Sequence, residues 1–166
     1  ILCLSFLRLL ELEINERLIF PACEEINVRQ AYEDFKSKLN EVDKGEFSAE
    51  WEYRISCLER VNRHKHVGLR FGEIMTVFDA LRFKRYKRES VHREFAGAAR
   101  TIIGKFLTEE GMTALADGSF VRMIEPKKLE AFRSPAAGAR YNGLEIALSC
   151  RRYVEQELMN LARYVK

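Results

Sequence analysis

The sequence predicts an all-α protein, a single-domain bundle of about five to seven helices. Apolar residues recur at helical spacing in successive segments, whereas only Phe120 to Ile124 alternates with the period of a strand. The 166 residues include 3 Pro and 9 Gly, too few for a disordered, collagenous or repeat-rich chain. Apolar types make up 47% of the chain and charged types 32%, so residues 1–166 can bury a sizeable core as one domain.

Three helices are expected in the first part of the chain. The first covers residues 2–19, and Pro21 ends or kinks it because proline has no backbone donor. The second covers residues 26–39 and is followed by a break at Asp43-Lys44-Gly45. Ser48 is the expected N-cap of the third helix, whose first turn carries two glutamates where the helix dipole favours acids.

The second part of the chain is expected to hold shorter helices and one long final helix. The expected elements are a helix over 74–81, a helix capped by Ser90 and extending to Phe106, short helices or turns over 108–117 and 126–132, a loop or junction over 134–143, and a last helix over Leu144–Val165. Six side chains are expected to be among the most buried: Phe35, Trp51, Phe78, Ile102, Phe106 and Leu148.

The cysteines and the missing motifs argue against a metal, a cofactor and an oxidising compartment. Cys3, Cys23, Cys57 and Cys150 form no C-x-x-C pair and no cluster with zinc-ligand spacing, and each has apolar or helical neighbours. We therefore expect reduced thiols and a cytoplasmic protein. The phosphate loop, the Rossmann fingerprint, the nucleophile elbow and the H-E-x-x-H motif are absent, so no cofactor and no metal is expected.

The N-terminal apolar run predicts neither a membrane span nor a signal peptide. Arg8 interrupts the run far short of the ~20 apolar residues that a span requires, so no membrane partner is expected. A first residue other than Met is compatible with a domain excised from a longer protein.

Positive charge is concentrated in the middle of the chain. Residues 1–59 hold 7 basic and 13 acidic side chains, whereas residues 60–93 hold 10 basic and 3 acidic ones together with all three histidines. Two dense runs, 60–66 and 82–88, carry most of these cations, and the second also contains two aromatic rings. Cations can bind phosphates while rings stack on bases. The candidate nucleic-acid-binding residues are Arg60, Arg63, Arg82, Arg85, Tyr86, Lys87 and Arg88.

Two structural explanations for the same cations stay open. The cations can lie exposed to solvent at the C-terminus of a helix, where they complement the helix macrodipole while the aromatic rings pack inward. Alternatively, the basic segment can pair with the acidic first third, within one chain or across a dimer. On a helix, Arg82, Arg85 and Arg88 would share one side and could contact successive phosphates.

A segment near the C-terminus resembles a known motif. Phe132-Arg133-Ser134-Pro135-Ala136-Ala137-Gly138, followed by Glu145-Ile146-Ala147-Leu148-Ser149-Cys150-Arg151-Arg152-Tyr153-Val154, is similar to the C-terminal signature of HEPN-type domains. These are small helical bundles of many prokaryotic defence, toxin and CRISPR-associated proteins, and their usual motif is Arg-Asn-Pro-Ala-Ala-His before a final helix. Residues 67–75 also resemble the start of a middle helix in such domains.

The resemblance implies a role for Arg133 but argues against catalysis. In active members the arginine contacts the scissile phosphate and the histidine transfers the proton, so that RNA is cleaved by its own 2′-hydroxyl without a metal. Here Gly138 occupies the position of the histidine and Ser134 that of the asparagine, so the proton-transfer group is missing. His66 and His92 are the remaining candidates, because each follows an arginine within two turns.

Three functions are compatible with these observations. The first is a non-catalytic HEPN-like module that dimerises and binds RNA, a nucleotide or a partner protein, with a role in prokaryotic defence. The second is a metal-independent endoribonuclease of HEPN type, which requires His64, His66 or His92 to reach Arg133. The third is a protein–protein interaction or scaffold domain that has no nucleic-acid role.

Overall fold

Helices dominate the described part of the chain, which in the computed structural model covers residues 2–64, 67–82, 84–124, 132 and 143–166. Within these ranges the only β-type pairing is an isolated bridge between Leu107 and Val165, so the all-α prediction is confirmed. The α-helices in these ranges are α1 (Leu2–Ile14), α2 (Phe20–Glu24), α3 (Val28–Ser37), α4 (Glu41–Arg63), α5 (Phe71–Ala80), α6 (Val91–Ile103), α7 (Glu109–Asp117), α8 (Ser119–Met123) and α11 (Gly143–Tyr164).

The described ranges hold nine α-helices, against a prediction of about five to seven, and the predicted last helix agrees with the structure. Seven of the described α-helices have nine or more residues, whereas α2 and α8 have five each. Helix α11 begins and ends within one residue of the expected bounds. Ser90 caps α6 as expected, because its hydroxyl accepts a hydrogen bond from the backbone N–H of Arg93 at 3.3 Å. In the described ranges, no helix combines the length and the apolar character that crossing a membrane requires.

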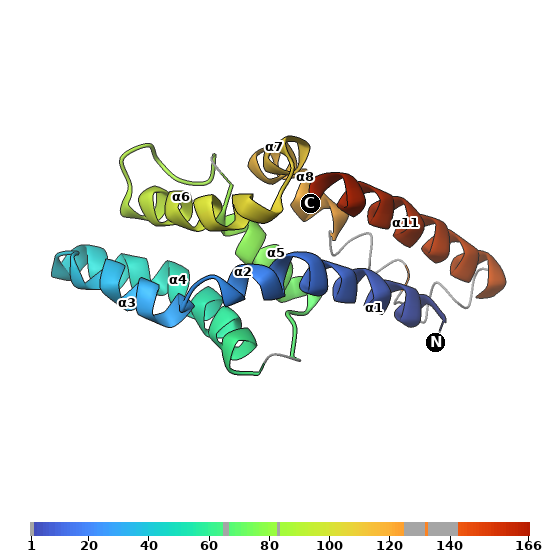
Figure 1. The fold of residues 1–166 in the computed structure, drawn as a ribbon, viewed down its shortest axis with the longest axis horizontal. Coiled ribbons are helices and arrows are strands. Elements are labelled where there is room, and N and C mark those ends of the chain that lie inside the picture. The colour runs from blue at the N-terminus through green and yellow to red at the C-terminus, as the bar shows by residue number, and fades with distance from the viewer. Residues whose placement is uncertain (1, 65–66, 83, 125–131, 133–142) are drawn as a thin grey trace.

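The helices pack around two apolar clusters (Figure 1). The larger cluster involves α1, the end of α4, α5, α7, α8 and α11, whereas the smaller one joins α3, the first part of α4 and α6 around Phe47 and Phe95. Helices α1 and α11 lie side by side at one end of the elongated molecule, and α3 and α4 pair at the other. Leu58 of α4 packs against both clusters, so α4 connects them.

The core prediction is correct for two of the six residues and wrong for the other four, of which one is exposed. Trp51 and Phe78 are buried, with 3% and 1% of their surface exposed. Three more of the predicted residues are half-buried: Phe35, Ile102 and Phe106. Leu148 was predicted to be buried and is 42% exposed, because α11 directs Ala147 and Cys150 toward the core instead.

Helix α4 begins earlier than predicted. Asn40 is its N-cap, and the side-chain oxygen of Asn40 accepts a hydrogen bond from the backbone N–H of Asp43 at 2.9 Å. The expected break at residues 43–45 therefore lies inside the helix. Ser48, predicted as the cap, lies in the helix interior and accepts a hydrogen bond from the Tyr32 hydroxyl at 3.2 Å. The prediction gave too much weight to one helix-breaking glycine and overlooked the better cap before it.

The expected interruption at Pro21 takes the form of a wider helical turn. Helix α1 continues through a π-helical turn, Asn15–Ile19, into α2, which has Pro21 in its first turn. Proline donates no hydrogen bond to the residue four positions back. In the wider turn, the N–H of Phe20 bonds instead to the carbonyl of Asn15, five residues earlier.

The π-helical turn places a buried asparagine against the segment that leads into α5. The amide of Asn15 donates to the carbonyl of Leu69 at 2.8 Å and accepts from the Leu69 N–H at 2.7 Å. A Cβ added at Gly68 would lie 2.5 Å from the Asn15 side chain, so this close approach requires glycine. Glu11 accepts a hydrogen bond from the N–H of Phe71 at 3.1 Å. Buried polar groups of the first helix therefore fix the start of α5.

Candidate nucleic-acid interface

The second basic run forms a loop between α5 and α6, which we call the basic loop (residues 82 and 84–90). The prediction that Arg82, Arg85 and Arg88 share one side of a helix is wrong, because α5 ends at Ala80 and the described residues after it form turns and bends. The last turn of α5 is tight, since the N–H of Leu81 bonds to a carbonyl only three residues back.

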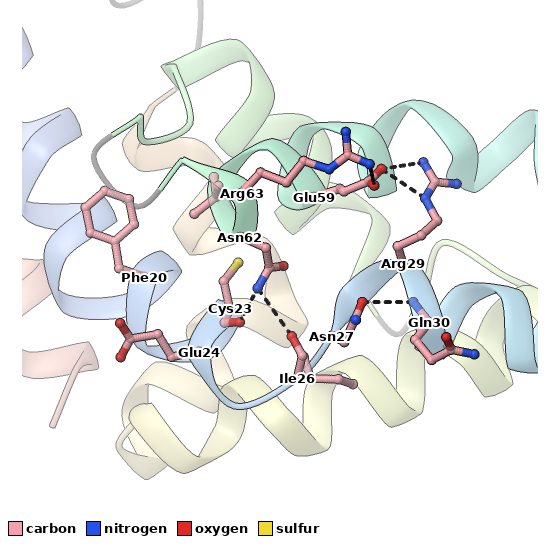
Figure 2. Close-up of a pocket in the computed structure, with 11 residues that line it drawn as sticks. Phe20, Cys23, Glu24, Ile26, Asn27, Arg29, Gln30, Glu59, Asn62 and Arg63 are labelled. Carbon is pink, nitrogen blue, oxygen red and sulfur yellow. Dashed lines mark hydrogen bonds and ion pairs between the residues drawn. The ribbon is translucent and has the colours of Figure 1, made fainter.

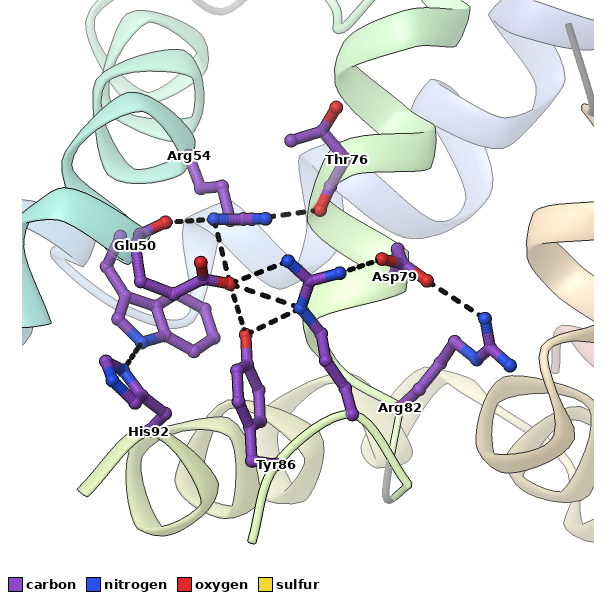
Figure 3. Close-up of polar contacts among 9 residues, drawn as sticks. Glu50, Arg54, Thr76, Asp79, Arg82, Tyr86 and His92 are labelled. Atoms are coloured by element: carbon purple, nitrogen blue, oxygen red, sulfur yellow. Dashed lines mark hydrogen bonds and ion pairs between the residues drawn. The ribbon is translucent and has the colours of Figure 1, made fainter. Parts of the chain in front are cut away.

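Glu50 of α4 anchors the basic loop (Figure 3). Its Oε1 atom accepts a hydrogen bond from the Tyr86 hydroxyl at 2.7 Å and lies 3.0 Å from a guanidinium nitrogen of Arg85. Arg54, one turn further along α4, also pairs with Glu50 at 3.2 Å and donates to the carbonyl of Thr76 in α5 at 3.0 Å. One carboxylate thus ties the basic loop to α4, and its arginine partner ties α4 to α5.

The environment of Glu50 favours its charged form. Burial alone would raise the pKa of Glu50, but the hydrogen bond from Tyr86 and the charges of Arg54 and Arg85 outweigh burial and lower it. Burial and the neighbouring Glu50 both raise the pKa of Tyr86, so the phenol stays protonated and remains a hydrogen-bond donor. Glu50 is therefore a charged acceptor for one neutral donor and for cationic donors. Hydrogen bonds to a charged group are stronger than those between neutral groups.

The candidate catalytic residue His92 is held by ring contacts and a hydrogen bond. The indole Nε1–H of Trp51 donates to Nδ1 of His92 at 3.2 Å (Figure 3), so that nitrogen acts as an acceptor. The His92 ring also stacks on Phe47 and on Tyr86, with ring centroids 6.2 Å and 5.4 Å apart. These contacts give His92 a packing role at the start of α6.

The cations of the basic loop fall into two groups. Arg82 pairs with Asp79 at 3.0 Å, and Arg85 pairs with both Asp79 and Glu50, so these two arginines form ion pairs within the chain. The side chains of the second group are exposed and form no ion pair with the acids that the structure describes: Lys84, Lys87 and Arg88. The predicted binding residues of this loop thus include both paired cations and cations without an ion pair to a described acid. Lys84, which was not among the predicted binding residues, belongs to the second group.

The first basic run is largely paired. Arg60 contacts Glu73 of α5 at 2.7 Å, and Arg63 contacts Glu59 one turn earlier on α4. The hydrogen bond that Arg60 donates to Glu73 is the main cause that raises the pKa of Arg60, although burial opposes it. The N–H of His64 closes the last turn of α4 by bonding to the Arg60 carbonyl at 2.9 Å.

A polar pocket of about 760 Å³ lies beside the first run, between the α2–α3 corner and the last turns of α4 (Figure 2). Glu59 binds Arg29 at 2.9 Å from one side and Arg63 from the other. The amide of Asn62 donates to the carbonyls of Cys23 and, at 3.4 Å, Ile26. The arginines of this pocket are therefore matched by acids, and the pocket offers no excess of positive charge.

The two basic runs do not form one surface. Glu50, which holds the basic loop, and Arg63, in the first run, are separated by about 20 Å along α4 at ~1.5 Å per residue. In Figure 1 the end of α4 and the loop between α5 and α6 also lie on opposite sides of the molecule. The predicted nucleic-acid-binding residues thus belong to two separate places, and among the described residues of the two runs only the basic loop has a group of exposed cations without ion pairs.

Several predicted residues lie outside the described part of the chain. Arg133, Ser134 and Gly138 of the HEPN-like motif belong to this group, and so does His66. In the described part, no three His, Cys, Asp or Glu side chains gather as metal ligands would.

Comparison with known proteins gives no family assignment. No protein-family model, no curated protein and no solved structure matches this chain significantly.

Proposed function

We propose that this chain is a non-catalytic, HEPN-like helical module that binds single-stranded RNA through the basic loop. The observation that carries the proposal is the division of cations within that loop. Arg82 and Arg85 form ion pairs with acids of the same chain, whereas Lys84, Lys87 and Arg88 are exposed without an ion pair to a described acid. Three cations in one anchored loop provide a site for successive phosphates.

The anchoring of the loop supports binding. Tyr86 is held by Glu50 and packs on Trp51 and His92, so the residues between the exposed cations are already ordered. A preordered loop loses less conformational entropy on binding than a free one does. The resemblance of residues 132–154 to HEPN-type domains supports RNA as the polyanion, since active members of that family act on RNA.

The proposal predicts a specific loss of RNA affinity. Replacing Lys84, Lys87 and Arg88 by Gln should weaken binding of a fluorescent single-stranded RNA at least tenfold at low salt. Each lost phosphate contact should lower the slope of log affinity against log salt by ~0.7, so the three should lower it by about 2. Fluorescence anisotropy over a series of salt concentrations measures both quantities.

The matched control variant removes three positive charges from other parts of the surface. Arg17, Arg151 and Arg163 are exposed and each pairs with an acid on the surface, so their triple Gln variant should bind RNA nearly as the wild type does. Equal losses of RNA affinity in both variants would mean that only the net charge matters, and would contradict a binding site at the basic loop. If no RNA binding is measurable and the loop variant instead loses its dimer or an acidic partner, the chain is an interaction domain.

The same proposal predicts that purified protein does not cleave RNA above background in the presence of a chelator. The physical reason is the Gly138 in the motif, which supplies no imidazole for proton transfer. Gel analysis of a labelled single strand checks this expectation. Cleavage that disappears in His66→Ala would overturn the non-catalytic assignment and identify a metal-independent ribonuclease.

A further inference from the structure

Two cysteines from distant parts of the sequence meet where α1 packs against α11. Cys3 lies near the start of α1, and Cys150 lies in the first half of α11. The thiol of Cys150 donates to the carbonyl oxygen of Cys3 at 3.6 Å, and the proximity of Cys3 contributes, after burial, to the raised pKa of Cys150. The Cys150 sulfur therefore contacts residue Cys3 across the helix interface.

The other two cysteines have different surroundings. Cys57 of α4 lies 3.8 Å from the carboxylate of Glu73, which does not react with a thiol. Cys23 of α2 is buried beside the polar pocket, and burial raises its pKa to about 12. These residues serve as internal controls, because they differ from the Cys3–Cys150 pair in having no described thiol partner.

The two paired thiols differ in their access to solvent. Cys3 is half-buried, whereas Cys150 is fully buried. Burial, followed by the neighbouring Cys3, raises the pKa of Cys150 to about 12. An external reagent must reach the sulfur with which it reacts, so the first reaction with such a reagent belongs to Cys3, the less buried of the two residues.

We propose that Cys3 and Cys150 are a redox-active pair that closes to a reversible disulfide between α1 and α11. The oxidant is a low-molecular-weight disulfide of the glutathione class. The Cys3 thiolate attacks one sulfur of glutathione disulfide, which forms a mixed disulfide and releases one glutathione thiol. The Cys150 thiol then gives up its proton as it attacks the Cys3 sulfur, and the second glutathione leaves as a thiolate that takes up a proton. The protein loses two electrons and two protons, and the oxidant takes them up as two thiols.

The disulfide would add a covalent cross-link between two helices that already pack side by side. Helix α11 follows the HEPN-like segment in the sequence, so the bond would fix the first half of this helix to α1. A cross-link between distant parts of the sequence restricts the unfolded chain and raises the melting temperature. Reduction by an excess of thiol would reverse both effects. This inference does not depend on RNA binding.

The test is oxidation of the folded wild-type protein in glutathione buffers of graded oxidised fraction, followed by acid quenching, alkylation and mass spectrometry. The expected product is lighter by two hydrogen atoms and yields one cross-linked peptide pair that contains Cys3 and Cys150. Its melting temperature is higher than that of the reduced protein, and dithiothreitol reverses the change. Cys23→Ala and Cys57→Ala should give the same product.

Two single variants separate the steps. Cys150→Ala should stop at a glutathione adduct on Cys3, and Cys3→Ser should form neither the adduct nor the cross-link. If Cys150→Ala fails to fold, the peptide map of the wild type still decides the matter. A wild-type protein that carries only a glutathione adduct on Cys3, a cross-link through Cys23 or Cys57, or four alkylated thiols at every oxidised fraction would overturn the proposal.

Discussion

Single buried polar residues determine how several segments meet in this protein. Asn15 satisfies both backbone groups of Leu69, and Gly68 leaves the space that its amide occupies. Neither role could be predicted from the sequence, because the partners are 54 positions apart and an asparagine inside a helix pattern carries no signal of its own. The resulting contact is specific in geometry and can be tested by paired substitutions.

A methyl group at Gly68 should destabilise the protein by about 2–4 kcal/mol, since it would collide with the Asn15 amide. Asn15→Ala should cost about 1–3 kcal/mol, because it leaves the backbone groups of Leu69 without partners. In the double variant the collision is absent, so the two effects should not add. Urea unfolding of the four proteins measures the coupling.

Gly72→Ala is the matched control for this cycle. It lies four residues later, within α5, and no atom lies within 4 Å of the position that its Cβ would take. Alanine in a helix is favoured over glycine, so this variant should be neutral or more stable by about 0.5–1 kcal/mol. Additive effects of the Gly68 and Asn15 substitutions would contradict the proposed contact.

At the scale of elements, helix identity was predictable from the sequence but several boundaries were not. The apolar spacing and Ser90 identified α6, and the last helix was placed within one residue. The start of α4 was missed because Gly45 was taken as a break, although tertiary packing and the Asn40 cap extend the helix across it. The basic loop was missed for a similar reason, since its turn depends on Glu50, which is 36 positions from Tyr86.

The two candidate caps of α4 give opposite expectations. Asn40→Ala should destabilise the protein by about 1 kcal/mol because it removes the acceptor for the Asp43 N–H. Ser48→Ala should change stability by less than about 0.5 kcal/mol, since better helix propensity offsets one lost hydrogen bond. Chemical denaturation compares them. A larger loss for Ser48→Ala would place the helix start where the sequence pattern placed it.

The link between α4 and the basic loop should depend on pH. The pKa of Glu50 lies below its ordinary value of 4.5, so the carboxylate stabilises the fold above that pH, and this contribution is lost as the pH falls through the lowered pKa. Glu50→Gln should therefore destabilise the protein by about 1–3 kcal/mol at neutral pH, and by less on acidification below 4.5.

Unfolding of the wild type and of Glu50→Gln between pH 7 and pH 3 measures this dependence. Glu46→Gln is the control, because Glu46 is exposed on the same helix and pairs with no described cation. The Glu46 variant should follow the wild type across the range. A Glu50 effect that stays constant down to pH 3 would show that its charge has no part in holding the loop.

At the scale of the whole molecule, two apolar clusters share α4. Trp51 is the only tryptophan of the chain and lies in the smaller cluster, so its fluorescence reports on α3, α4 and α6. Backbone circular dichroism reports on all helices. Because Leu58 and α4 belong to both clusters, we expect both signals to change in one transition in urea. Separate midpoints would mean that the smaller cluster unfolds independently.

The most direct test of the proposed function is to map where RNA binds. Backbone amide resonances of the isotope-labelled protein can be followed by NMR while a short single-stranded RNA is added at low salt. The proposal predicts the largest shifts at residues 84–90 and the start of α6, with little change at Arg60, Arg63 and the polar pocket. Shifts that centre on the end of α4, or no shifts at saturating RNA, would contradict the assignment of the basic loop as the binding site.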